Sequence, residues 1–172
     1  MKPKLLQAYM RTAETFAELS HAKRLHVGAI VVKDDRIISI GYNGMPAGWD
    51  NNCEYKEYLT YGHSFGENAA DYFDQTDENG KMYRLKTRPE VLHAESNAIS
   101  KLARSSESGD GATMFITHAP CMDCSKLIYQ SGIRRVYFGS AYRDDSGVQF
   151  LKSCGIAVEQ LERGPDGKAA DC

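Results

Sequence analysis

The stretch that decides the fold is TMFITHAPCMDCSKLIYQSGIRRVYF, residues 113–138. Residues 113–117 and 135–138 are rich in β-branched and aromatic side chains, which is typical of strands. Residues 121–130 between them carry apolar side chains at helical spacing. A strand, a helix and a second strand in this order predict an α/β sheet with helices on its faces.

The rest of the chain extends this pattern in both directions. Toward the C-terminus, residues 147–153 are expected to be helical and residues 156–161 extended, and upstream residues 94–102 are expected to be helical. Residues 27–32 and 36–41 are β-branched runs on either side of Asp34 and Asp35, so they predict a hairpin. Residues 3–20 have the apolar spacing of an amphipathic helix, with Pro3 at its start.

The length of 172 residues suits one domain over residues 1–172, with no internal repeat. Residues 53–88 interrupt the regular pattern with an acidic, turn-rich segment, which we interpret as an inserted, partly helical, solvated excursion. Residues 164–172 lack an apolar pattern and are expected to form a mobile tail.

Composition excludes several classes of protein. Hydrophobic residues at 42% and charged residues at 26% are ordinary for a globular domain and exclude disorder as the main state. The net charge of −2 gives no general attraction to nucleic acid. The longest apolar run, residues 27–32, is far shorter than the roughly 20 residues that span a bilayer. We therefore expect neither a nucleic-acid partner nor a membrane partner.

The five cysteines are an odd number, which fits poorly with a closed disulfide framework and favours a reducing cytoplasm. Cys121 and Cys124 lie three positions apart, so they are expected to be either metal ligands or a redox dithiol. We interpret Cys154 as a small core residue and Cys172 as a terminal thiol.

Cys121, Cys124 and His93 form a soft ligand set that suits zinc and leaves one tetrahedral position for water. Glu95 follows His93 by two positions, so the two side chains diverge in a regular helix. They can converge only if His93 is still extended and Glu95 lies in the first helical turn. A carboxylate beside an activated water is a general base and then an acid.

The motifs His93-Ala94-Glu95 and Pro120-Cys121-Met122-Asp123-Cys124 carry the zinc-deaminase signature. The chain therefore resembles the cytidine and deoxycytidylate deaminase superfamily. GYNGMP at residues 41–46 and AYRDD at 141–145 make it most similar to the deoxycytidylate (dCMP) branch. This resemblance implies a three-layer α/β/α fold with a mixed five-stranded sheet. It also implies hydrolytic deamination of dCMP to dUMP with release of ammonia, which supplies dUMP for thymidylate synthesis.

The resemblance also assigns residues to roles. His93, Cys121 and Cys124 would hold one zinc ion per chain, and Glu95 would carry protons to ring nitrogen 3 and then to the leaving amine. Asn43 and the backbone at Ala94 would bind the substrate, Tyr142 would pack on the nucleotide and Arg143 would bind its phosphate.

Regulation is a further implication of the resemblance. It implies a homo-oligomer, a hexamer in many relatives, activated by dCTP with Mg²⁺ and inhibited by dTTP. It also implies residence in the cytoplasm, which is the host cytoplasm if a virus encodes the protein. The residues expected at the regulatory nucleotide are Lys23, Arg24, Gly41, Asn43, Gly44 and Arg104.

Several other interpretations stay open at this point. Cys53 could complete a closed structural zinc site, and the cysteine pair could act as a redox dithiol. An editing cytidine or adenosine deaminase of nucleic acid would share the same catalytic core, as would another free-nucleotide deaminase. A binding module without catalysis is disfavoured by the intact His93-Ala94-Glu95 motif. His118 is interpreted as a loop histidine, and no second zinc site is assembled from Cys53 and His63.

Overall fold

A computed structural model describes residues 1–59, 73–142 and 144–161. Its centre is a five-stranded sheet in the order β2-β1-β6-β7-β8. The strands are β1 (Gly28–Lys33), β2 (Arg36–Tyr42), β6 (Thr113–His118), β7 (Arg135–Ser140) and β8 (Ala157–Gln160). β1 pairs antiparallel with β2 and β6, whereas β6, β7 and β8 run parallel. The predicted mixed five-stranded sheet is confirmed.

Helices cover both faces of this sheet. They are α1 (Pro3–Ala17), α3 (Ala94–Leu102), α4 (Met122–Gln130) and α5 (Ser146–Ser153). α1 packs on one face, where Tyr9 and Met10 meet Phe115 and Tyr137. The other face packs against the buried side chains of α3, α4 and α5, among them Ala98, Ile128 and Leu151. This is the three-layer α/β/α arrangement that the sequence predicts.

Local sequence explains how closely these layers approach. Gly28 lies under α1, where a Cβ atom would meet the carbonyl oxygen of Ala13 at 2.0 Å. Gly41 lies under α3, where a Cβ atom would meet the carbonyl oxygen of Ala94 at 2.1 Å. Neither helix could pack so near its strand if these positions carried a side chain. Gly41 therefore sets the distance between β2 and α3, the helix that begins next to His93.

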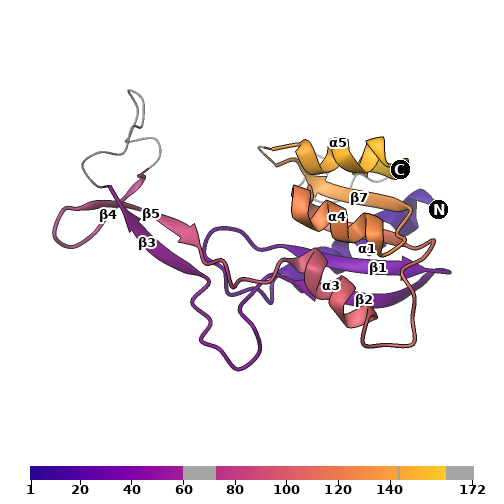
Figure 1. Ribbon diagram of the computed structural model, residues 1–172, viewed down its shortest axis with the longest axis horizontal. Coiled ribbons are helices and arrows are strands. Elements are labelled where there is room, and N and C mark those ends of the chain that lie inside the picture. Colours follow the sequence, from indigo (N-terminus) through magenta and orange to yellow (C-terminus); the bar gives the residue numbers. More distant parts are fainter. Residues whose placement is uncertain (60–72, 143, 162–172) are drawn as a thin grey trace.

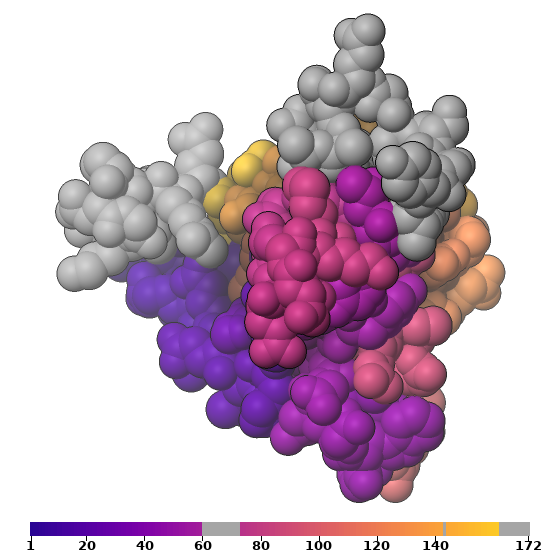
Figure 2. Space-filling view, turned by 90° about the vertical axis from the view of Figure 1, so that its left-hand side faces the viewer, coloured from indigo at the N-terminus to yellow at the C-terminus, as the bar shows by residue number. Residues whose placement is uncertain are grey.

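A second, three-stranded sheet extends away from the main body (Figure 1). It consists of β3 (Glu54–Tyr58), β5 (Met82–Thr87) and β4 (Gln75–Thr76), with β5 in the middle. We call residues 53–59 and 73–88 the arm, and Figure 2 looks onto the arm with residues 73–88 in magenta and pink. Segment 53–88, interpreted from sequence as a partly helical excursion, contributes this arm. Its described residues form strands and turns, however, and the expectation of helix is not met in them, because cross-strand pairing uses their backbone groups.

The start of one helix differs from the expected residues 121–130. α4 begins at Met122 with Cys121 as its extended N-cap, one residue after the expected start at residue 121. The expected mobile tail, residues 164–172, lies outside the described residues, as does segment 60–72. Among the residues that the structure describes, no helix has the length and apolar character needed to cross a membrane.

Candidate active site

Two helix N-termini place the predicted metal ligands next to each other. His93 is the extended N-cap of α3, Cys121 is the extended N-cap of α4, and Cys124 lies in the first turn of α4. Their ligand atoms all lie within 4.8 Å of one another. His93 Nδ1 is 3.4 Å from Cys124 Sγ and 3.7 Å from Cys121 Sγ. The three side chains that the sequence singled out therefore form one cluster.

The donor chemistry of this cluster fits zinc. Two thiol sulfurs and one imidazole nitrogen are three of the usual ligands of a catalytic zinc, which keeps its fourth position open. Cys53 is not a member of the cluster in the part of the chain that the structure describes. Its side chain is buried in a separate apolar cluster with Ala22 and Val91. The closed structural site with Cys53 as fourth ligand is therefore wrong.

The two cysteines differ sharply in acidity. The Cys121 thiolate accepts hydrogen bonds from the Cys124 thiol and from His93, and this lowers the pKa of Cys121 to about 4. The same interaction with Cys121, together with burial, raises the pKa of Cys124. The hydrogen bond to Cys121 raises the pKa of His93. One sulfur is therefore already deprotonated at neutral pH, as a metal ligand must be.

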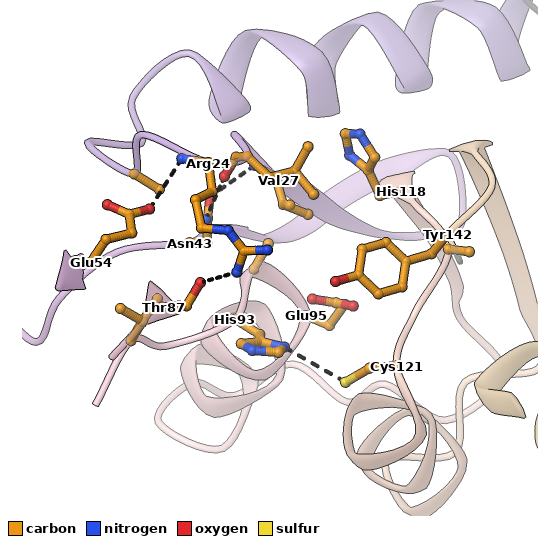
Figure 3. Close-up of a pocket in the computed structure, with 15 residues that line it drawn as sticks. Arg24, Val27, Asn43, Glu54, Thr87, His93, Glu95, His118, Cys121 and Tyr142 are labelled. Atoms are coloured by element: carbon orange, nitrogen blue, oxygen red, sulfur yellow. Dashed lines mark hydrogen bonds between the residues drawn. The ribbon is translucent and has the colours of Figure 1, made fainter. Parts of the chain in front are cut away.

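Glu95 lies in the first turn of α3 and is only 4% exposed. Burial raises the pKa of its carboxyl group, because desolvation disfavours the charged form. With His93 still extended and Glu95 in the helix, both residues line the same cavity (Figure 3). The predicted convergence of these two residues at a helix start is confirmed.

A cavity of about 340 Å³ opens beside the cluster. This lies in the range of roughly 300–1,000 Å³ that is common for small-molecule sites. In Figure 3 the Arg24 guanidinium group lies above His93 and to the left of Glu95, Cys121 and Tyr142, and all five residues line the cavity. One cavity therefore contains both metal-ligand side chains and a guanidinium group.

The Arg24 side chain is held in this cavity by contacts from the arm. Its Nη1 donates a hydrogen bond to Thr87 Oγ1 at 3.1 Å. The backbone N–H groups of Lys23 and Arg24 donate to Glu54 Oε1 at 2.9 and 3.1 Å. Arg24 was expected at a regulatory nucleotide, but the structure places it in the same cavity as the metal ligands.

Asn43 also lines the cavity, and its amide is largely occupied by backbone groups. Its Nδ2 donates to the carbonyl oxygen of Leu25, and its Oδ1 accepts from the N–H of Val27, both at 2.8 Å. The side chain thus ties the segment around Leu25 to the end of β2. One amide hydrogen and one lone pair remain for a ligand.

The other residues with predicted roles are distributed as follows. Ala94 is buried in the cavity wall, and Tyr142 is 49% exposed and points into the cavity in Figure 3. The backbone of Gly44 pairs with Leu92, one position before His93. Lys23, Gly41, Gly44 and Arg104 are not among the residues that line this cavity. Arg143 and His63 lie outside the described residues.

Three polar residues of the cavity had not been assigned to the site from sequence. His118 lines the wall, with its Nδ1 3.0 Å from Thr117 Oγ1. His118 lies two residues before Pro120, and this closeness to the cysteine motif was the signal that could have indicated a place in the cavity wall. Glu54 and Thr87 come from the arm. No local signal identifies them, because only the fold brings the base of the arm to the cavity.

Comparison with known proteins gives a consistent picture. Residues 3–140 match the family model described as the cytidine and deoxycytidylate deaminase zinc-binding region. The deoxycytidylate deaminase of Enterobacteria phage T4 is 39% identical over 150 residues, which cover 77% of each chain. The human deoxycytidylate deaminase is 35% identical over 140 residues, which cover 80% of this chain and 66% of the human one.

A solved structure extends the similarity to three dimensions. The dCMP deaminase from the cyanophage S-TIM5, in complex with dCMP and dUMP, matches with a TM-score of 0.75 and 42% sequence identity. The match covers 94% of this chain and 99% of the cyanophage chain. From the family match, these similarities and its own histidine and cysteine cluster, we conclude that the chain belongs to the cytidine and deoxycytidylate deaminase family.

Proposed function

We propose that the protein catalyses the hydrolytic deamination of dCMP to dUMP with release of ammonia. One observation carries this proposal: a single cavity joins the metal ligands and the buried Glu95 to the guanidinium group of Arg24. A cytosine ring fits the chemistry of the first end, and a phosphate fits the second. Relatives named deoxycytidylate deaminase, and the cyanophage enzyme in complex with dCMP and dUMP, support this choice of substrate.

His93, Cys121 and Cys124 would hold the zinc ion. When bound, zinc supplies Lewis acidity that activates water near neutral pH. Glu95 takes one proton from water and delivers it to ring nitrogen 3, and then takes the remaining proton from the hydroxyl group added to C4 and delivers it to the exocyclic amine. A C4–O bond forms and the C4–N bond breaks, so dCMP and water give dUMP and ammonia. The buried position of Glu95 keeps its carboxyl group away from bulk water during these transfers.

Substrate binding uses the remaining wall of the cavity. Arg24 is placed to bind the phosphate, and the family resemblance assigns the same role to Arg143. Tyr142 packs on the nucleotide, and the backbone at Ala94 contacts the pyrimidine. Asn43 contacts the sugar or base with the amide hydrogen and the lone pair that are not used in its hydrogen bonds to Leu25 and Val27. Such a site selects a small phosphorylated ligand rather than a polymer.

The direct test is ammonia release from dCMP, deoxycytidine and a single-stranded oligodeoxynucleotide at matched cytosine concentration. We expect release from dCMP well above release from the other two. Release from the oligonucleotide but not from dCMP would show a nucleic-acid-editing deaminase instead. Release from another cytosine nucleotide in preference to dCMP would show a different free-nucleotide deaminase.

Regulation forms a separate part of the proposal. By family resemblance, dCTP with Mg²⁺ activates the enzyme, dTTP inhibits it, and the chain assembles as a homo-oligomer, a hexamer by analogy with relatives. Steady-state rate curves with each nucleotide test the first two statements. Light scattering coupled to size-exclusion chromatography tests the third. Rates that are indifferent to both nucleotides would remove the regulatory part and leave the catalytic part intact.

A further inference from the structure

The arm reaches the active-site cavity at its base. Glu54 on β3 and Thr87 on β5 both line the cavity wall. They are directly opposed partners in the antiparallel β3–β5 pairing. Opposed residues of an antiparallel pair project from the same face of the sheet. The arm therefore presents Glu54 and Thr87 together to the main body.

Both residues contact Arg24, and they contact opposite ends of it. Glu54 Oε1 accepts from the backbone N–H of Arg24 at 3.1 Å, and Thr87 Oγ1 accepts from its guanidinium Nη1 at 3.1 Å (Figure 3). An arginine side chain has several rotatable bonds, and fixing both ends restricts them before a ligand arrives. The hydrogen bonds from the arm thus pre-organise a side chain that belongs to another part of the chain.

The guanidinium group keeps most of its binding capacity. Arginine carries five N–H donors, and Thr87 accepts from one nitrogen. Within residues 1–59, 73–142 and 144–161, no carboxylate forms an ion pair with Arg24. Glu54 directs Oε1 to backbone N–H groups instead. The free donors of Arg24 suit a phosphate group, for which planar guanidinium groups are well matched.

We propose that Glu54 and Thr87 are positioning residues that hold Arg24 for the phosphate of the nucleotide. The arm is then part of the apparatus that distinguishes a nucleoside monophosphate from a nucleoside. This inference rests on the proposed function for the identity of the ligand. It gives the arm a role in ligand binding, whereas the sequence alone predicted a solvated excursion.

The test compares binding of dUMP and deoxyuridine by calorimetry, with kcat and KM for dCMP alongside. Thr87→Val removes the hydroxyl and keeps the shape and the strand preference, whereas Thr87→Ser keeps the hydroxyl. We expect Thr87→Val to weaken dUMP binding about tenfold and to raise KM for dCMP with little change in kcat. Deoxyuridine binding should stay within about twofold, and Thr87→Ser should restore dUMP binding.

Glu54 is tested by the same logic. Glu54→Leu removes the acceptor of two backbone N–H groups and should weaken dUMP binding by about tenfold or more. Glu54→Gln keeps an acceptor oxygen and should remain near the wild type. Lys86→Ala is the matched control on the arm, because Lys86 pairs with Glu57 at 2.9 Å and does not line the cavity. If Glu54→Leu fails to fold, the Thr87 series decides alone.

A double-mutant cycle separates positioning from general destabilisation. In an Arg24→Ala background, Thr87→Val should cause no further loss of dUMP binding, because its effect passes through Arg24. Additive losses, or equal losses for dUMP and deoxyuridine, would overturn the inference. If the wild type binds dUMP tightly but does not deaminate dCMP, the proposed function fails. The positioning inference is still decided by the ratio of dUMP to deoxyuridine affinity.

Discussion

At the scale of single residues, the proposed mechanism makes turnover depend on Glu95. Glu95→Gln keeps the size of the side chain and the ligand cluster but removes the proton carrier. We expect kcat to fall by about 10²–10⁴ with zinc content unchanged. Metal analysis and steady-state kinetics on the same preparation measure both quantities. A Glu95→Gln protein with wild-type kcat would refute the assignment of Glu95 as the proton carrier.

His93 is the matched contrast to Glu95, because it is proposed as a metal ligand and not as a proton carrier. Its Nδ1 faces both cysteine sulfurs, so His93→Ala removes one of three donors. We expect this variant to lose zinc as well as activity, whereas Glu95→Gln loses activity alone. Retention of one zinc ion per chain by His93→Ala would show that the ion is bound elsewhere.

Asn43 matters through the direction of its hydrogen bonds. Its amide donates to Leu25 and accepts from Val27, and an aspartate can only accept. We therefore expect Asn43→Asp to destabilise the protein by about 1–3 kcal/mol, because a carboxylate oxygen would face the Leu25 carbonyl oxygen, and we expect a similar loss for Asn43→Ala. Chemical denaturation measures this loss. An Asn43→Asp protein as stable as the wild type would show that the amide does not hold this segment.

At the scale of elements, the close packing of α3 on β2 depends on the absence of a side chain at Gly41. A Cβ atom there would also lie 2.6 Å from the backbone nitrogen of Ala98, so Gly41→Ala must displace the helix or the strand. Such overpacking costs about 1–3 kcal/mol. Because α3 begins next to His93 and carries Glu95, we expect weaker zinc binding as well as a lower Tm.

Gly28→Ala is the control for this effect. It creates a clash of the same kind with α1 on the opposite face, where a Cβ atom would lie 2.0 Å from the Ala13 carbonyl oxygen. Its Tm should also fall, while zinc affinity stays near that of the wild type. Equal loss of zinc in both variants would mean that zinc binding follows global stability and not the position of α3.

The Tyr9 hydroxyl group on α1 forms a hydrogen bond to the turn of the β1–β2 hairpin. Asp34 and Asp35 have positive φ angles of 50° and 57°, the form that a two-residue hairpin turn requires. The Tyr9 hydroxyl donates to the carbonyl oxygen of Asp35 at 2.8 Å. Burial first, and then the charge of Asp35, raise the pKa of Tyr9. Tyr9→Phe should therefore cost about 1 kcal/mol at neutral pH.

The pH dependence of this difference has a defined sign. The folded-state pKa of Tyr9 is higher than its unfolded value of about 10. Its contribution to stability is complete below that pH and is lost as the pH rises through the folded pKa. Denaturation at pH 8 and above pH 10 should show the gap between wild type and Tyr9→Phe narrowing. A gap that widens at high pH would contradict this account.

At the scale of the whole molecule, the metal ligands join the start of α3 to the start of α4. A ligand that binds only the folded state stabilises it, by about 4 kcal/mol at a thousandfold excess over its Kd. We expect a chelator to lower the Tm by about 10 °C and abolish turnover, and added zinc to restore both. Metal analysis should find one ion per chain, also in Cys53→Ala. An unchanged Tm after complete removal of zinc would contradict this coupling.

The sequence by itself determined the elements and the chemistry of the metal site. The alternation over residues 94–161 predicts the strands and helices of the main sheet, because each element carries its own hydrophobic period. The motifs around His93 and Cys121 predict the ligands, because the spacing within each motif is short. Segment 53–88 had no such period, so its described residues appeared as strands only in the structure.

The tertiary structure alone decided how the cavity is completed. Arg24, Glu54 and Thr87 are 30 to 63 positions apart where they contact one another, and no local pattern relates them. From sequence alone, the charge of Arg24 does not distinguish a surface residue from a residue of a regulatory site or of an active site. Its place depends on how β3 and β5 pair and on where the base of the arm lies. These are properties of long-range packing, and a single sequence does not encode them in any local pattern.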